Sequence, residues 1–145
     1  MVVKTYRGQI TSAGAERIRL STIKGTVGYR IIKFESMPLG VNLTIENVMK
    51  IYKTPQTAGS NVINFTDSDL LAATILKLGS SSSEALTMSV IFDREIFNQD
   101  ISITSRDDGG SNRACNYYLE LEVIPLASDE AAITTVKAMR GQAVD

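Results

Sequence analysis

Apolar and polar residues alternate along most of the chain, and this spacing predicts β-strands that bury one face. In 117–123, one aromatic and three aliphatic residues take every second position, and Tyr118 and two glutamates fill the positions between them. Alternation, β-branched residues and bounding Gly or Pro predict further strands. These are 2–10, 16–20, 29–34, 48–53, 86–93 and 101–104. About seven or eight short strands predict a mostly β fold, a single β-sandwich or jelly-roll-like domain.

Segment 70–78 fits two structures. As a helix it would place Leu70, Leu71 and Ile75 on one face, with Asp67 or Asp69 as the N-terminal cap. We favour a strand because the surrounding sequence is β. The run of serines at 80–83 is expected to form a polar loop that connects elements within one domain.

The last two predicted strands flank a segment rich in turn residues, 106–112, which contains two adjacent glycines. Glycine accepts positive φ, and Asp and Asn side chains can bond to their own backbone, so such a segment favours a tight reversal. We therefore expect residues 100–124 to form a β-hairpin.

The pattern changes from a period of two to a helical period near the C-terminus. Ser128 can cap a helix, acidic residues follow it, and Gly141 ends it, while Pro125 ends the preceding strand. The apolar stripe of this helix is Ala132, Ile133, Val136 and Met139. We thus divide the chain into a sandwich at 1–126 and a helix with a tail at 127–145. The helix either covers the sandwich or reaches a neighbouring molecule, and Ile133, Val136 and Met139 are candidates for an interaction surface.

Size and charge narrow the function classes. The 145 residues suffice for one core. The 15 basic residues against 16 acidic ones form no long block, so nucleic-acid binding is not favoured.

The apolar stretches are far shorter than the ~20 residues of a membrane span. The first residues lack a secretory signal, so synthesis in a cytoplasm is expected. Cys115 has no partner for an internal disulfide and should be a buried small apolar residue.

The residue inventory gives little support to catalysis. The chain has no histidine, which removes the Ser-His-Asp and Cys-His systems and the usual zinc sites, and it lacks a Gly-rich phosphate loop. Asp93, Glu95 and Asp100 could form a glycosidase pair, but a solvated turn with local ion pairs is the better interpretation. We expect a non-enzymatic protein with no catalytic residues, no cofactor and no metal ion.

Four further residues are candidates for a binding surface. Asp107, Asp108 and Asn112 carry oxygens that could bind calcium or a sugar, although their spacing is not that of an EF-hand loop and the turn requires such residues in any case. Tyr118 should point away from the core, where its ring could stack on a sugar or pack on a neighbouring strand or subunit.

The sequence is similar to a known group of proteins in three segments, 29–35, 90–101 and 116–122, and in the C-terminal helix that follows the third segment. From Tyr6 to Arg140 the pattern resembles small β proteins common in aquatic bacteriophage genomes, which are regarded as virion components. The resemblance implies a capsid cement or decoration subunit or a small jelly-roll shell protein. Such a protein is made in the host cytoplasm, resides in the virion, and binds itself and the major capsid protein, and no catalytic residues come with the resemblance. The alternative is a carbohydrate- or receptor-binding module of a phage tail or a cell surface.

Overall fold

The computed structural model describes residues 1–79 and 85–143, the last part of the helix (139–143) for its backbone only. The described residues contain eight strands followed by one helix. The strands are β1 (Val2–Ile10), β2 (Ala15–Ile18), β3 (Val27–Met37), β4 (Ile45–Tyr52), β5 (Leu70–Leu78), β6 (Ala85–Ile91), β7 (Ile101–Asp107) and β8 (Cys115–Pro125). The helix is α1 (Ser128–Ala143). The loop expected at 80–83 and the last residues of the expected tail, 144–145, lie outside this description.

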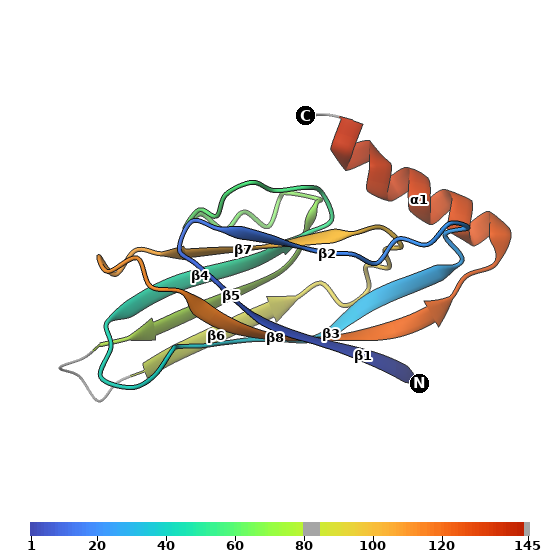
Figure 1. Ribbon diagram of the computed structural model, residues 1–145. Helices are drawn as coiled ribbons and strands as arrows, with labels where there is room; N and C mark the ends of the chain where they lie inside the picture. The colour runs from blue at the N-terminus through green and yellow to red at the C-terminus, as the bar shows by residue number, and fades with distance from the viewer. Residues whose placement is uncertain (80–84, 144–145) are drawn as a thin grey trace.

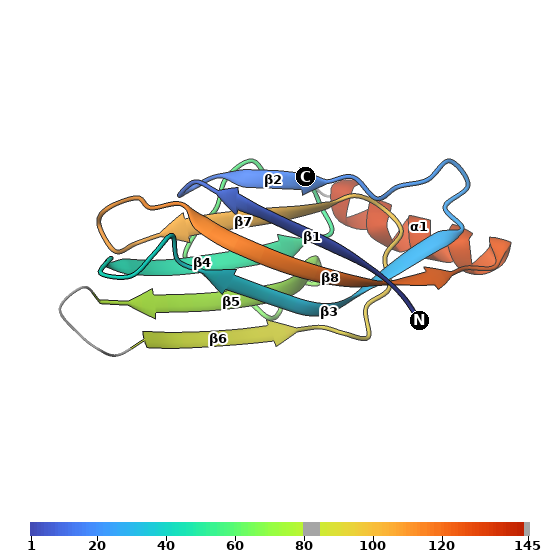
Figure 2. The same cartoon turned by 60° about the horizontal axis from the view of Figure 1, so that its bottom comes forward.

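The strands form two antiparallel sheets that pack face to face, which confirms the predicted β-sandwich (Figure 1). One sheet has the order β1-β8-β3 and the other the order β2-β7-β4-β5-β6. Figure 2 shows the three-stranded sheet crossing in front of the five-stranded one.

The strand order is that of a jelly roll with one difference. Strands from opposite ends of the chain pair with each other, β1 with β8 and β2 with β7, while β4 pairs with β5. A complete jelly roll would also pair β3 with β6. Here β6 pairs with β5 at the end of the other sheet, which leaves β3 as an edge strand. On the side of β3 that faces away from β8, the pairing among the described residues is an isolated bridge between Tyr29 and Phe97.

The expected hairpin at 100–124 is wrong. Its two strands exist, but β7 pairs with β2 and β4 whereas β8 pairs with β1 and β3, so the turn between them carries the chain from one sheet to the other. Segment 70–78 is indeed a strand, β5. It lacks a clear alternation because residues on both of its faces are buried.

The core lies between the inner faces of the two sheets. Phe34 and Leu119 of the three-stranded sheet and Met49 and Ile103 of the five-stranded sheet are all fully buried. Cys115 is also fully buried, as the sequence predicted. The sandwich is therefore a rigid frame, and any binding has to use its edges, its outer faces, its corners or the helix.

Candidate functional site

The corner after β7 is built around the carboxylate of Asp107. Its Oδ1 atom accepts N–H bonds from Glu46 at 3.0 Å and Gly109 at 2.8 Å, and its Oδ2 atom accepts one from Arg113 at 2.8 Å. Burial by itself would raise the pKa of Asp107, but these N–H donors lower it overall. Asp107 is only 1% exposed, so the expectation that it belongs to a binding surface is wrong. Its carboxylate fixes the corner instead.

The two other polar candidates of this corner are exposed. Asp108 accepts a hydrogen bond from Arg106 at 2.9 Å and another from the side chain of Asn61, and Asn112 adopts a positive φ of 49°. Within 1–79 and 85–143, no group of three or more His, Cys, Asp or Glu side chains is arranged to hold a metal ion. Asp108 and Asn112 remain available to a partner that contacts this corner.

The three carboxylates considered for catalysis are not gathered together. Asp93 and Glu95 are exposed in the turn after β6. Asp100 instead accepts N–H bonds from Leu20 at 2.7 Å and Ser21 at 2.9 Å and forms an ion pair with Arg17. Asp100 therefore holds the segment that follows β2 in place through these hydrogen bonds and the ion pair.

Tyr118 lies in a hollow on the outer face of the three-stranded sheet. The hollow has a volume of about 480 Å³, with Arg7 and Gln9 of β1 on one side and Glu35 and Met37 of β3 on the other. The Tyr118 hydroxyl donates to a Glu120 carboxylate oxygen at 2.7 Å, and this hydrogen bond raises the pKa of Tyr118. An aromatic ring among amide and charged side chains is a surface that can bind a polar ligand.

Gly8 also lines this hollow, and a side chain at this position would collide with the neighbouring ring of Tyr117 on the inner side of the sheet. A Cβ atom on Gly8 would lie 2.8 Å from the ring of Tyr117. That ring is buried, and its hydroxyl donates to Glu16 at 2.9 Å, which joins the two sheets. The floor of the hollow is thus fixed by packing from below.

Helix α1 packs against the end of the sandwich through small residues. Ala131 and Ala138 are buried, and the buried side chain of Asn98 donates to the Thr135 hydroxyl at 2.7 Å. The predicted apolar stripe faces solvent instead, with Ile133 59% and Val136 50% exposed. The side chain of Met139 lies outside the described part. The helix therefore covers the end of the sandwich and also presents an apolar face that the described residues leave uncovered.

Strand β6 adds a second exposed apolar surface. Leu86, Met88 and Val90 lie on one side of this edge strand and are 48%, 56% and 40% exposed. The sequence predicted the alternation of β6, but not that its apolar side would face outward. Alternation indicates that one face of a strand is apolar and the other polar, but it does not indicate which of the two faces the rest of the chain covers.

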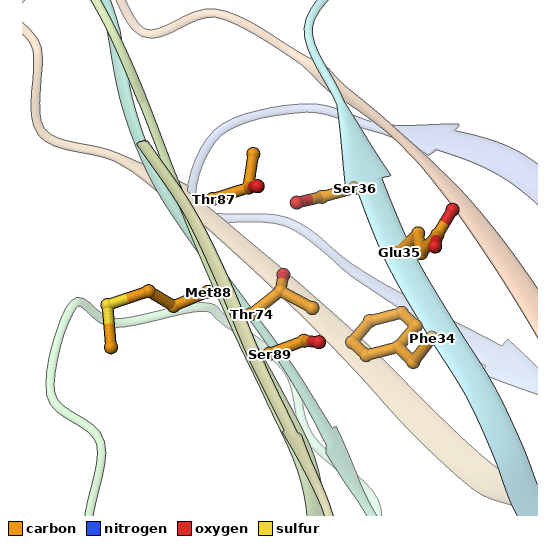
Figure 3. Close-up of a pocket in the computed structure, with 7 residues that line it drawn as sticks. All are labelled: Phe34, Glu35, Ser36, Thr74, Thr87, Met88 and Ser89. Atoms are coloured by element: carbon orange, nitrogen blue, oxygen red, sulfur yellow. The ribbon is translucent and has the colours of Figure 1, made fainter. Parts of the chain in front are cut away.

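The other side of β6 faces a pocket of about 270 Å³ between β3 and the strands β5 and β6. Figure 3 shows Ser36, Thr74, Thr87 and Ser89 pointing into this gap. The Thr74 hydroxyl oxygen is buried and has no hydrogen-bond partner among the described residues. The pocket occupies the place where β3 and β6 would pair in a complete jelly roll.

No family model matches the chain, and no curated protein matches it in sequence. Among the described residues, no helix is long and apolar enough to cross a membrane.

Proposed function

We propose that this chain is a non-enzymatic structural protein of a bacteriophage particle, a capsid cement or decoration subunit or a small jelly-roll shell protein. It is made in the host cytoplasm, assembles into the virion, and binds both copies of itself and the major capsid protein. The sequence resemblance described above supports this proposal, and so does the jelly-roll strand order, which viral capsid and lectin domains share. Because one fold serves many functions, the exposed surface of this chain matters more to its function than the fold does.

The observation that carries the proposal is the presentation of large apolar side chains on rigid elements. Ile133 and Val136 of α1 are exposed at one end of the sandwich, and Leu86, Met88 and Val90 are exposed on β6. Grouped apolar residues on a surface mark sites of protein association. Two such surfaces suit a subunit that contacts two kinds of neighbour.

We assign the apolar face of α1 to the major capsid protein. A helix presents apolar side chains one turn apart, as Ile133 and Val136 are, to a groove on a partner. Each contact of this size is weak, but many copies on a symmetric shell add their contacts together. The near-neutral net charge of −1 does not oppose close packing of copies.

Purified particles test this proposal directly. Mass spectrometry of phage particles whose genome encodes this chain should find it in many copies per particle. A particle preparation that lacks the chain would overturn the proposal.

A variant of the helix tests the assigned contact. Changing Ile133 and Val136 together to Glu should reduce incorporation into particles, whereas changing the exposed Lys137 to Glu should not. Both variants alter exposed positions of the same helix, so their thermal stabilities should be similar. Equal incorporation of the two variants would count against the helix as the contact.

A second function is favoured by the hollow around Tyr118. A module that binds a carbohydrate or a receptor, on a phage tail or a cell surface, would stack a sugar ring on Tyr118 and bond its hydroxyls to Gln9 and Asn116, which already share a 3.0 Å hydrogen bond. A glycan array with and without calcium tests it, with Tyr118→Ala as the variant. No binding to any glycan would dispose of this function.

A further inference from the structure

The two sheets have four edge strands, and three of them carry devices that discourage pairing with another chain. Strand β1 points Lys4 inward over the ring of Tyr29, 5.8 Å from its centroid. Strand β2 has only four residues and includes Glu16 and Arg17. Strand β3 has a β-bulge and carries Arg30, Lys33 and Glu35. Short length, bulges and charged residues are the usual protection of a sheet edge.

The fourth edge strand, β6, has none of these devices. Its sequence from Ala85 to Ile91 contains no charged residue, no proline and no glycine. It pairs with β5 over its whole length without a bulge. All but the last of its residues are exposed. A regular, uncharged edge strand of high β propensity is a site for strand pairing.

The backbone groups on the free side of β6 can be identified. The Phe92 N–H donates to the Leu71 carbonyl at 3.0 Å, so this residue turns its polar groups toward β5. In an antiparallel pair, alternate residues turn toward the same neighbour. The N–H and C=O groups of Thr87 and Ser89 therefore face the free edge, and in the described part of the chain no strand other than β5 pairs with β6.

We infer that β6 is a self-association site, at which β6 of a second copy of this chain pairs antiparallel with it about a twofold axis at Met88. In this register, Met88 meets Met88 of the partner subunit on the outer face, and Leu86 meets Val90 of the partner subunit. On the inner face, Thr87 meets Ser89 of the partner subunit. Apolar residues thus meet apolar ones, hydroxyls meet hydroxyls, and no charges are opposed.

The shape of the sandwich leaves room for this pairing. β6 is the outermost strand of the five-stranded sheet, and in Figure 2 it lies beyond β3 at that edge, where a second copy can approach it. The pocket of Figure 3 would then lie next to the two paired β6 strands, because Thr87 and Ser89 line it. The second copy is the occupant because a β6 strand is complementary to itself in both residue type and length.

This inference rests on the self-binding part of the proposed function, but not on the particle. Sedimentation equilibrium of the purified chain should give a dimer whose mass does not rise further with concentration. The variants Met88→Lys and Met88→Glu each place like charges opposite each other at the axis. Each should raise the dimer dissociation constant by about tenfold or more, and an equimolar mixture of the two should restore a heterodimer.

Val3→Lys is the matched control, because Val3 is also a partly exposed apolar residue of an edge strand. It should leave the dimer intact. Met88 is 56% exposed, so its variants should fold, and circular dichroism checks this. A monomeric wild-type chain, equal weakening by Val3→Lys, or no heterodimer in the mixture would each overturn the inference.

Hydrogen exchange of the wild-type chain gives a result that depends on no variant. The amides of Thr87 and Ser89, which face the free edge, should become more protected as the concentration rises, and amides of β2 should not. Unchanged exchange at Thr87 and Ser89 would contradict the pairing. The two proposals can fail separately. A β6 dimer that is missing from particles overturns the virion function alone, whereas an abundant virion protein that stays monomeric overturns the pairing alone.

Discussion

The side-chain amide of Asn98 donates a 2.7 Å hydrogen bond to the hydroxyl of Thr135 and thereby ties helix α1 to the sandwich. The same nitrogen donates to the Gly25 carbonyl at 3.0 Å. One buried amide thus holds together three segments that are distant in sequence. Such a group stabilises a fold mainly because leaving its buried partners unpaired is unfavourable.

Asn98→Ala should therefore lower the free energy of unfolding by about 2 kcal/mol. Thr135→Ala should lower it by about 1 kcal/mol, whereas Thr134→Ala should have almost no effect, because the Thr134 hydroxyl bonds only within the helix to Glu130. Urea denaturation measures all three. Equal effects of the two threonine variants would show that the helix is held in another way.

Gly59 should not tolerate a larger residue. A Cβ atom there would lie 2.2 Å from the backbone oxygen of Ser105, where only the backbone can give way. Gly59→Ala should lower the free energy of unfolding by roughly 1–3 kcal/mol, as overpacking does. Gly40→Ala is the control, since its new Cβ would have no neighbour within 4 Å. Thermal unfolding should separate the two variants, and similar melting temperatures would be the contrary result.

Asp100 should make the stability depend on pH in the acidic range. Burial works to raise its pKa, but N–H donors from Ser21 and Leu20 and the Arg17 side chain outweigh it and hold the pKa at about 2, below the ordinary 3.8. A carboxylate with a depressed pKa stabilises the fold above its unfolded pKa, and that contribution disappears as pH falls from about 4 to about 2. It amounts to about 2 kcal/mol, since the side chain is only 13% exposed.

Asp100→Asn should remove this contribution at neutral pH and flatten the dependence between those two pH values. The exposed Asp93→Asn should do neither. Chemical denaturation of the three proteins at pH 7, 4 and 2 measures the difference. A wild-type chain as stable as Asp100→Asn at pH 7 would refute the assignment.

Cys115 should be unreactive in the folded chain. Burial raises the pKa of its thiol to about 11, and the Sγ atom donates to the Met37 carbonyl at 3.4 Å. Since the thiolate is the reactive form, labelling by a thiol reagent at pH 8 should be at least about 100-fold slower in the native protein than in urea. Complete native labelling within minutes would contradict the burial.

The sequence predicted the strands well because alternation is local, and it predicted their partners poorly because pairing is not. Segment 106–112 has the residues of a hairpin turn, yet it forms a corner between sheets. The Asp107 carboxylate explains this, since it accepts the N–H of Glu46, a residue far along the chain on β4. No turn signal within the segment could reveal that partner.

The surfaces were predicted in part. The sequence identified the apolar stripe with Ile133 and Val136, and these residues are exposed, because small residues such as Ala131 face the sandwich instead. A small side chain permits close approach but carries little signal in an apolar pattern. The apolar side of β6 was missed as a surface for a related reason. Its exposure follows from the position of β6 at the edge of the sheet, which only the topology determines.

The pairing of β1 with β8 has a consequence for how the chain comes to be folded. Along its full length β1 pairs with β8 and, in the part of the chain described here, it forms no ladder with any other strand. During synthesis, β8 is translated about a hundred residues after β1. Until then β1 has no partner on the nascent polypeptide, so the three-stranded sheet forms late, by closure of a very long loop. Such closure is slow, and we expect the newly made chain to need protection from aggregation on the ribosome.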